Sequence, residues 1–228
     1  MKNGPADPGD PHRGSKIVWF GPALEEARNA VILLHGRGDS ARGILTLVPE
    51  LRAPHSTFLA PQATGQSWYP CGFMAPIDRN EPWLSSALER IRVALDTVKE
   101  VVPRERTVLM GFSQGACLAL EFVARNPGLY GGVVAFSGGL IGPDGMIYDR
   151  PGSLQGTPVF LGCSDIDAHI PVGRVHDSAD TMEALGGTVE KQIYPGMGHT
   201  VNRDEIMWTH NLLSQLEPNQ KTYGRSGA

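Results

Sequence analysis

From residue 17 onward, short apolar runs alternate with segments of helical periodicity, and this order restricts the possible folds more than any other feature. The middle runs are almost continuously apolar, as expected for strands that helices cover on both faces. The last run alternates between apolar and polar residues, which is typical of an edge strand. The predicted strands are residues 17–20, 30–34, 57–60, 107–110, 132–136, 158–161 and 189–194. The sequence therefore predicts an α/β fold with a mostly parallel central sheet.

Three segments have clear helical patterns. The first starts after Asn80, a candidate N-cap, and stops at Pro103. A second helix is predicted for residues 171–185, and a third starts near Asn202, with Glu205 in place for a capping box, and ends by residue 218. The first helix has apolar residues three or four apart, at Leu84, Leu88, Ile91, Leu95, Val98 and Val102.

The 228 residues suit one domain. Residues 1–15 are rich in Gly, Pro and Asp and lack the apolar region of a signal peptide, so we expect a disordered leader. We expect the α/β domain to comprise residues 16–218 and a flexible tail to comprise residues 219–228. Two connections, residues 61–80 and 137–156, are long for a compact domain, and such loops are often functional.

Charge and cysteine content exclude several classes of protein. With 20 basic and 24 acidic residues the net charge is −4, and no polybasic run is present, so we expect neither nucleic-acid binding nor stable membrane association. Cys71, Cys117 and Cys163 are odd in number and widely spaced, which argues against disulfides and against a zinc site. We therefore expect a cytoplasmic protein that holds no metal and needs no cofactor.

The run Gly111-Phe112-Ser113-Gln114-Gly115 stands directly between an apolar strand and a helical segment. A serine on such a tight turn exposes its hydroxyl, and the flanking glycines leave room for the chain to reverse. The first free N–H groups of the new helix point toward whatever reacts there. Ser113 is therefore a candidate nucleophile.

A serine hydroxyl needs a positioned base, and the base needs an orienting carboxylate. His199 follows the last strand in a glycine-containing loop, and we select it over the other six histidines as the base. Asp165 and Asp167 both follow the strand at 158–161, and spacing does not separate them. The carboxyl ends of parallel strands meet at one edge of a sheet, so these side chains are expected to converge.

Two further segments can complete such a site. Residues 34–39 contain two glycines directly after a central strand, which lets the backbone approach a reacting group closely, although a plain strand-to-helix turn is the alternative. The loop at 61–80 carries apolar side chains that either line a substrate pocket or form a satellite cluster of the core. The candidate pocket residues are Trp68, Tyr69, Phe73 and Met74.

These motifs together resemble the carboxylesterase/phospholipase family of α/β-hydrolases, which includes acyl-protein thioesterases and small esterases. The resemblance extends from about residue 18 to residue 216. The motifs that carry it are Leu34-His35-Gly36-Arg37-Gly38-Asp39, Ala60-Pro61-Gln62 followed by Trp68, Gly111-Phe112-Ser113-Gln114-Gly115, Ser137-Gly138, Asp167-Ala168-His169-Ile170-Pro171 and Gly196-Met197-Gly198-His199.

The resemblance implies an α/β-hydrolase fold with Ser113 as nucleophile, His199 as general base and Asp167 as the carboxylate that orients it. Asp167 is preferred to Asp165 because the family's acid lies four residues before a proline. The oxyanion donors it implies are the backbone N–H groups of Arg37 and Gln114. The chain is too short between its later strands for a separate lid domain.

Two residues depart from the family's pattern. Arg37 stands where a small or apolar residue is common, and its cation at the pocket mouth favours an acidic substrate or pairs with Asp39. Ala168 stands where proline is usual, which loosens the loop that carries Asp167, residues 162–170 (the acid loop).

The resemblance implies a serine hydrolase, a carboxylesterase or a lysophospholipase, that cleaves carboxylic esters through an acyl-enzyme. It also implies a small-molecule substrate and a monomeric or homodimeric enzyme. The alternatives are an acyl-thioesterase, a lactone hydrolase, and a catalytically silent binding module on the same fold. Lactone hydrolases of this kind often carry Cys at the position of Ser113, and silent modules usually lack a triad residue.

Overall fold

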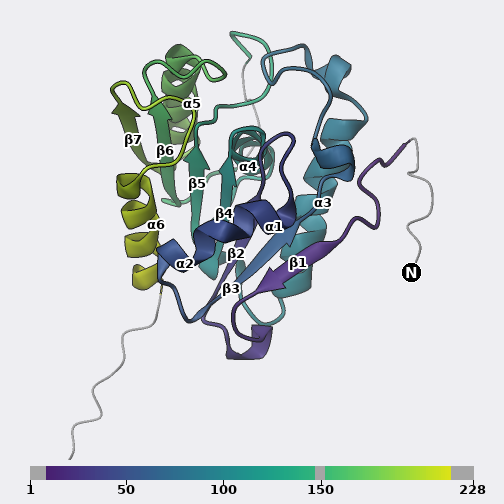
Figure 1. Ribbon diagram of the computed structural model, residues 1–228, viewed down its shortest axis with the longest axis vertical. Coiled ribbons are helices and arrows are strands. Elements are labelled where there is room, and N and C mark those ends of the chain that lie inside the picture. The colour runs from purple at the N-terminus through teal and green to yellow at the C-terminus, as the bar shows by residue number, and fades with distance from the viewer. Residues whose placement is uncertain (1–8, 147–151, 217–228) are drawn as a thin grey trace, which may run out of the picture.

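A computed structural model describes residues 9–146 and 152–216, which fold around a seven-stranded sheet (Figure 1). The strands are β1 (Ile17–Phe20), β2 (Asn29–Leu34), β3 (Ser56–Pro61), β4 (Thr107–Phe112), β5 (Gly132–Phe136), β6 (Pro158–Ser164) and β7 (Thr188–Tyr194). Their order across the sheet is β1-β3-β2-β4-β5-β6-β7. β1 pairs antiparallel with β3, and every other neighbouring pair is parallel. The strand predictions are confirmed, with β4 central and β7 at an edge.

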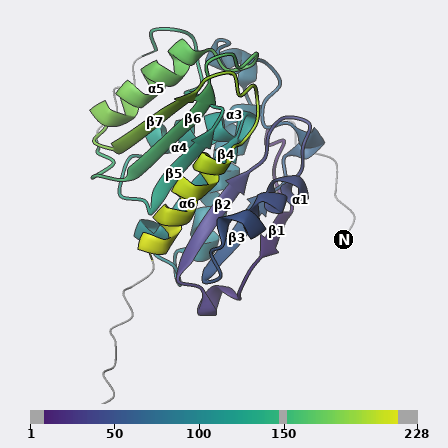
Figure 2. The ribbon, with the colours of Figure 1, turned by 60° about the vertical axis from the view of Figure 1, so that its left-hand side comes forward.

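Helices cover both faces of the sheet, as the apolar central runs predict. α3 (Trp83–Val98), α4 (Gln114–Arg125) and α5 (Val172–Ala184) pack on one face against a core that includes Ile32 and Leu109. α1 (Ala41–Ile44), α2 (Val48–Leu51) and α6 (Arg203–Gln215) pack on the other, where Leu33 and Met110 are buried. Figure 2 shows α1 and α6 in front of the sheet and α3 and α4 behind it. Successive strand residues thus serve two separate cores.

The helix predictions hold for the elements, but both ends of the first helix differ, since it ends at Val98 and Val102 lies beyond it. α3 begins at Trp83 after Pro82, so Asn80 is not its N-cap. The Asn80 amide instead accepts from the Cys71 N–H and donates to the Gly72 carbonyl, and it braces the long loop. At α6 the predicted capping box of Asn202 and Glu205 is confirmed. None of the described helices is long and apolar enough to cross a membrane.

The N-terminal segment differs from the expected disordered leader. Residues 1–8 lie outside the described residues, but residues 9–15 pack against the domain. His12 is fully buried, its backbone N–H donates to Ser86 Oγ, and its Nε2 lies 3.0 Å from the Trp68 carbonyl. Its Nδ1 accepts from the Thr64 N–H at 3.1 Å. The leader prediction is therefore wrong for residues 9–15, which belong to the domain.

The chain after α6 and part of the β5–β6 connection lie outside the described residues. The expected domain end at residue 218 and the tail at 219–228 fall within residues 217–228, which are not described, and residues 147–151 are not described either. The described part of the β5–β6 connection contains no helix or strand, in agreement with a fold that has no separate lid domain.

Candidate active site

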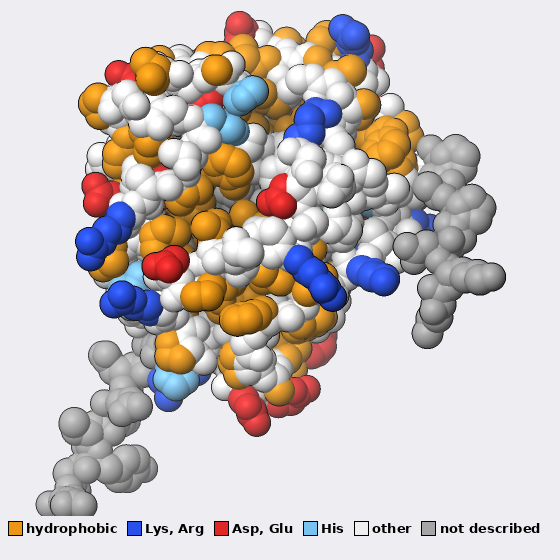
Figure 3. Space-filling model, in the orientation of Figure 1, with side chains coloured by type: hydrophobic (Ala, Val, Ile, Leu, Met, Phe, Trp, Pro, Cys, Tyr) orange, Lys and Arg blue, Asp and Glu red, His pale blue; other side chains and the backbone are white. Residues whose placement is uncertain are grey.

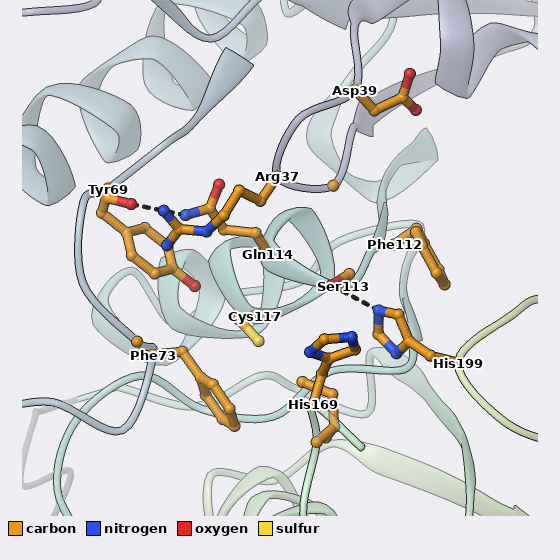
Figure 4. A pocket seen from close by; sticks show the side chains of 13 residues that line it. Arg37, Asp39, Tyr69, Phe73, Phe112, Ser113, Gln114, Cys117, His169 and His199 are labelled. Atoms are coloured by element: carbon orange, nitrogen blue, oxygen red, sulfur yellow. Dashed lines mark hydrogen bonds between the residues drawn. The ribbon is translucent and has the colours of Figure 1, made fainter. Parts of the chain in front are cut away.

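Ser113 occupies the sharp turn between β4 and α4, with φ 54° and ψ −119°, a conformation that residues with a side chain rarely adopt. The glycines around it are required by close packing. A Cβ on Gly111 would lie 2.3 Å from the Gly115 carbonyl carbon, and one on Gly115 would lie 2.0 Å from the Leu34 oxygen. The helix can therefore start immediately after the strand, and the Ser113 hydroxyl projects into a cavity of about 400 Å³ (Figure 4).

The three side chains expected to converge do so. His199 Nε2 lies 2.9 Å from Ser113 Oγ, and His199 Nδ1 lies 2.7 Å from Asp167 Oδ2. Because the carboxylate can only accept, Nδ1 carries the proton and Nε2 of the neutral imidazole is free to accept from the serine. The Asp167 side chain is fully buried, whereas the His199 side chain is 20% exposed. Of this series of hydrogen-bonded side chains, only the end at Ser113, which faces the cavity, is open to a substrate.

Asp167 is held as a carboxylate by its donors. Its Oδ1 accepts from the backbone N–H groups of His169 and Ile170, at 2.8 and 3.0 Å. Its Oδ2 also receives the Cys163 thiol at 3.7 Å. Burial by itself raises the pKa of Asp167, but the hydrogen bonds from His199 and from the two backbone N–H groups outweigh burial, and the pKa is lowered.

Asp165, the alternative acid, has a different position. It is exposed, and its Oδ1 accepts from the Gly196 N–H at 2.7 Å. Ser164 Oγ accepts from the Gly198 N–H at 3.1 Å. Both glycines have positive φ, 68° and 79°, which the reversal of this loop requires. Asp165 therefore anchors the loop that carries His199 and does not contact the imidazole.

The backbone around Ser113 provides two free donors. Among the described residues, neither the Arg37 N–H nor the Gln114 N–H has a hydrogen-bond acceptor. Gly36 lies against Ser113, since a Cβ on Gly36 would be 3.5 Å from the serine Cβ. The Gln114 N–H belongs to the first turn of α4. Both groups are thus available to an oxygen beside Ser113.

His35 holds the glycine turn that carries Arg37, a role that the sequence did not reveal. Its Nδ1 donates to the Gly36 carbonyl at 2.7 Å, and its Nε2 accepts from the Ala63 N–H at 3.1 Å. Burial lowers its pKa, although the bond to Gly36 opposes this, so the ring stays neutral. The position of His35 next to the glycines was the available signal. The Gln114 side chain similarly bonds to the Trp68 N–H and the Tyr69 carbonyl, each at 2.8 Å.

Of the four residues predicted to line a substrate pocket, two lie at the cavity beside Ser113. Tyr69 and Phe73 line the cavity, but Trp68 and Met74 do not. Trp68 is fully buried, its indole N–H donates to the His35 carbonyl, and its ring packs against His12. The Trp68 side chain therefore points into the core and supports the loop from inside.

No ion pair joins Arg37 to Asp39 in the part of the chain that the structure describes. The Arg37 guanidinium instead donates to the carbonyls of Pro70 and Cys71, at 3.0 and 2.7 Å. It lies 5.9 Å from the centre of the Tyr69 ring. Within the same described ranges, no group of His, Cys, Asp and Glu side chains is arranged to hold a metal ion.

Comparison with known proteins places the chain among hydrolases. The family profile described as Phospholipase/Carboxylesterase matches residues 22–216. Acyl-protein thioesterase 1 of Saccharomyces cerevisiae is 28% identical over 211 residues, which are 80% of this chain and 90% of the yeast protein. Carboxylesterase SOBER1 of Arabidopsis thaliana is 23% identical, with 83% and 91% of the two chains covered.

Solved structures give the same result. A phospholipase/carboxylesterase from Dyadobacter fermentans superimposes with a TM-score of 0.84 and 40% identity, and the match covers 88% of this chain and 97% of that one. The family profile, at residues 22–216, includes β4, β6 and β7, the strands that precede Ser113, Asp167 and His199.

Proposed function

The chain belongs to the phospholipase/carboxylesterase family and is a serine ester hydrolase, and we propose that Ser113, His199 and Asp167 are its catalytic triad. The observation that carries this proposal is the continuous set of hydrogen bonds from Asp167 through His199 to Ser113, at 2.7 and 2.9 Å. The nucleophile, its base and the orienting acid each have the partner that their role requires.

The proposed reaction proceeds through an acyl-enzyme. Ser113 Oγ attacks the ester carbonyl carbon while His199 Nε2 takes the hydroxyl proton. The backbone N–H groups of Arg37 and Gln114 donate to the oxyanion, and the loss of one such donor typically costs about 3 kcal/mol of barrier. His199 then protonates the departing alcohol, and a water activated by the same imidazole releases the acid. Asp167 keeps the imidazole oriented and stabilises its cationic form.

A thioester is the second candidate substrate, because relatives of this chain in two yeasts are named acyl-protein thioesterases. The same attack and the same oxyanion donors serve a thioester, and the departing thiolate needs less protonation. A lactone hydrolase has weaker support because the nucleophile is serine. A catalytically silent module has the least support, since no triad residue is missing.

We further propose a small-molecule ester as substrate and the cytoplasm as location. The described cysteines are unpaired, in keeping with a reducing compartment. A net charge of −4 supports neither nucleic acid nor an anionic membrane surface as a partner. A monomer or a homodimer would suffice because one chain supplies the triad and both oxyanion donors.

Replacement of the nucleophile tests this function. Ser113→Ala should lower kcat for p-nitrophenyl acetate by about a millionfold and abolish labelling by a fluorophosphonate probe. Ser214→Ala, which removes an exposed hydroxyl on α6, is the matched control and should leave both unchanged. Undiminished turnover by S113A, with wild-type thermal unfolding, would refute the proposed role of Ser113.

A further inference from the structure

The Arg37 side chain brings an unpaired positive charge to the cavity. Among the described residues, its guanidinium donates hydrogen bonds only to the carbonyls of Pro70 and Cys71, and no carboxylate lies within ion-pair distance. Arg92, Arg125 and Arg174, in contrast, each pair with an acidic side chain. The two carbonyl oxygens accept two of the five guanidinium N–H groups but do not neutralise the charge. Arg37 therefore remains a cation with N–H groups that can still donate hydrogen bonds.

Asp39 lines the cavity, but its carboxylate points away from Arg37, and the other acidic groups nearby have partners of their own. Asp39 Oδ1 lies against Gly43 in α1, where a Cβ on that glycine would be 1.9 Å from it, and Figure 4 shows the Asp39 carboxylate turned away from Arg37. The Asp167 carboxylate is bonded to His199, and the buried Glu121 carboxylate is paired with Arg125. The lining histidine side chains, His169 and His199, add no negative charge. The Arg37 end of the cavity is therefore electropositive.

The position of His199 determines which part of the substrate, the alcohol or the acyl group, lies near Arg37. The leaving oxygen must face His199 Nε2 to be protonated, so the acyl chain extends from Ser113 on the opposite side. Figure 4 shows Tyr69, Phe73 and Cys117 on that side, with Arg37 beside Tyr69. The space-filling view shows a basic side chain near histidines on this face of the molecule (Figure 3). An acyl chain in the cavity thus leads from the nucleophile toward the guanidinium.

We propose that the acyl group of the substrate carries a carboxylate, so that the preferred substrates are half-esters of short dicarboxylic acids, and that Arg37 is the residue that selects them. This inference rests on the proposed function of Ser113. The reaction converts the half-ester and water into the dicarboxylate, the alcohol and a proton. Phe73 and Ile170 contact the methylene groups, while spare guanidinium N–H groups receive the terminal carboxylate.

The expected preference for the charged half-ester is small because the Arg37 side chain is exposed to solvent. Arg37 is exposed, and two charges about 4 Å apart in water attract each other enough for roughly a fivefold preference. The attraction acts on the bound substrate, so it should appear mainly in KM. Because salt screens exposed charges, the preference should shrink as ionic strength rises.

The test compares monomethyl glutarate with dimethyl glutarate, which differ in the charge of the far end. The measured quantity is the ratio of kcat/KM for the two esters at low salt, in wild type and in three variants. Arg37→Met removes the charge, and the ratio should fall about fivefold. Arg37→Lys keeps the charge but cannot reproduce the two-pronged contact with Pro70 and Cys71, and it should retain most of the preference. Arg42→Met, an exposed arginine on α1, is the matched charge control.

The outcomes separate the possibilities. If R37K and R37M slow both esters equally, Arg37 only braces the loop, and the proposal is overturned. A ratio that R37M does not change overturns it as well. Monoesters of succinic, glutaric and adipic acid provide a second measurement on wild type, where a preference that ignores chain length would contradict a fixed cation. Failure of the proposed function would look different, because neither ester would then show turnover that depends on Ser113.

Discussion

The loop after β6 and the first turn of α6 each bury one carboxylate, and the pKa values of the two carboxyl groups are shifted in opposite directions. Asp167 contacts Cys163, whereas Glu205 Oε1 lies against Gly162, and these neighbouring residues face opposite sides of β6. Burial raises the pKa of Asp167, but the hydrogen bonds that it accepts outweigh burial and lower the pKa, whereas burial raises the pKa of Glu205 to about 7.

The difference lies in the donors around each group. Asp167 accepts from the His199 ring and from two backbone N–H groups. Glu205 Oε2 accepts from the Asn202 N–H, but its buried Oε1 has no partner among the described residues. Burial alone therefore does not determine the charge of a carboxylate, and the donors supplied by the local backbone do.

Among the substitutions that test this comparison, Asp167→Asn should have the largest effect. An amide at this position donates to His199 Nδ1, which shifts the imidazole proton to Nε2 and leaves no acceptor for Ser113. We expect kcat for p-nitrophenyl acetate to fall by about 10⁴-fold while the fold persists, as judged by circular dichroism. A loss smaller than tenfold would show that Asp167 does not orient the base.

Glu205→Gln should affect stability instead. The folded-state pKa of Glu205, about 7, exceeds the ordinary value of 4.5, so the folded protein binds this proton more tightly than the unfolded chain does. Stability is therefore lost as pH rises from about 4.5 through about 7, by up to about 3 kcal/mol. The neutral amide avoids this loss.

Urea unfolding at pH 5 and pH 8 measures this effect. E205Q should be more stable than wild type at pH 8, with a much smaller difference at pH 5. Glu50→Gln, an exposed residue of α2, is the control and should leave the pH dependence unchanged. An E205Q variant whose stability falls with pH as steeply as that of wild type would contradict the assignment.

The smallest effect is expected for Asp165→Ala, which sharpens the distinction between the two aspartates of the acid loop. The variant loses one bond to the Gly196 N–H, a contribution of about 1 kcal/mol to the position of the His199 loop. We expect kcat/KM to stay within about tenfold of wild type in the same ester assay. A loss as large as that of D167N would make Asp165 part of the catalytic machinery.

Local patterns explain why so much was predictable. β2 and β4 are apolar after their first residues, Asn29 and Thr107, so their burial on both faces could be inferred from sequence. The turn at Ser113 depends on glycines two residues away on either side, and the cap of α6 on residues three apart. Each signal lies within one short segment.

Long-range contacts explain what was missed. His12 is buried because of partners at residues 64, 68 and 86, and no pattern near residue 12 indicates this. Asn80 precedes a helical pattern and is therefore predicted as a cap. Its actual role, as acceptor for the Cys71 N–H, depends on how the loop folds and leaves no local pattern. Spacing from the strand does not separate Asp165 from Asp167, because the folded loop alone directs Asp167 to His199 and Asp165 to the Gly196 N–H.

The residues of the proposed triad follow strands at different places in the sheet. Ser113 follows the central strand β4, whereas His199 follows β7, which has a neighbour on one side only. Outer strands open more readily than inner ones under mild heat or denaturant. Loss of turnover therefore reports fraying of the sheet margin, and an inactivated sample can still contain an intact interior from which activity returns on cooling.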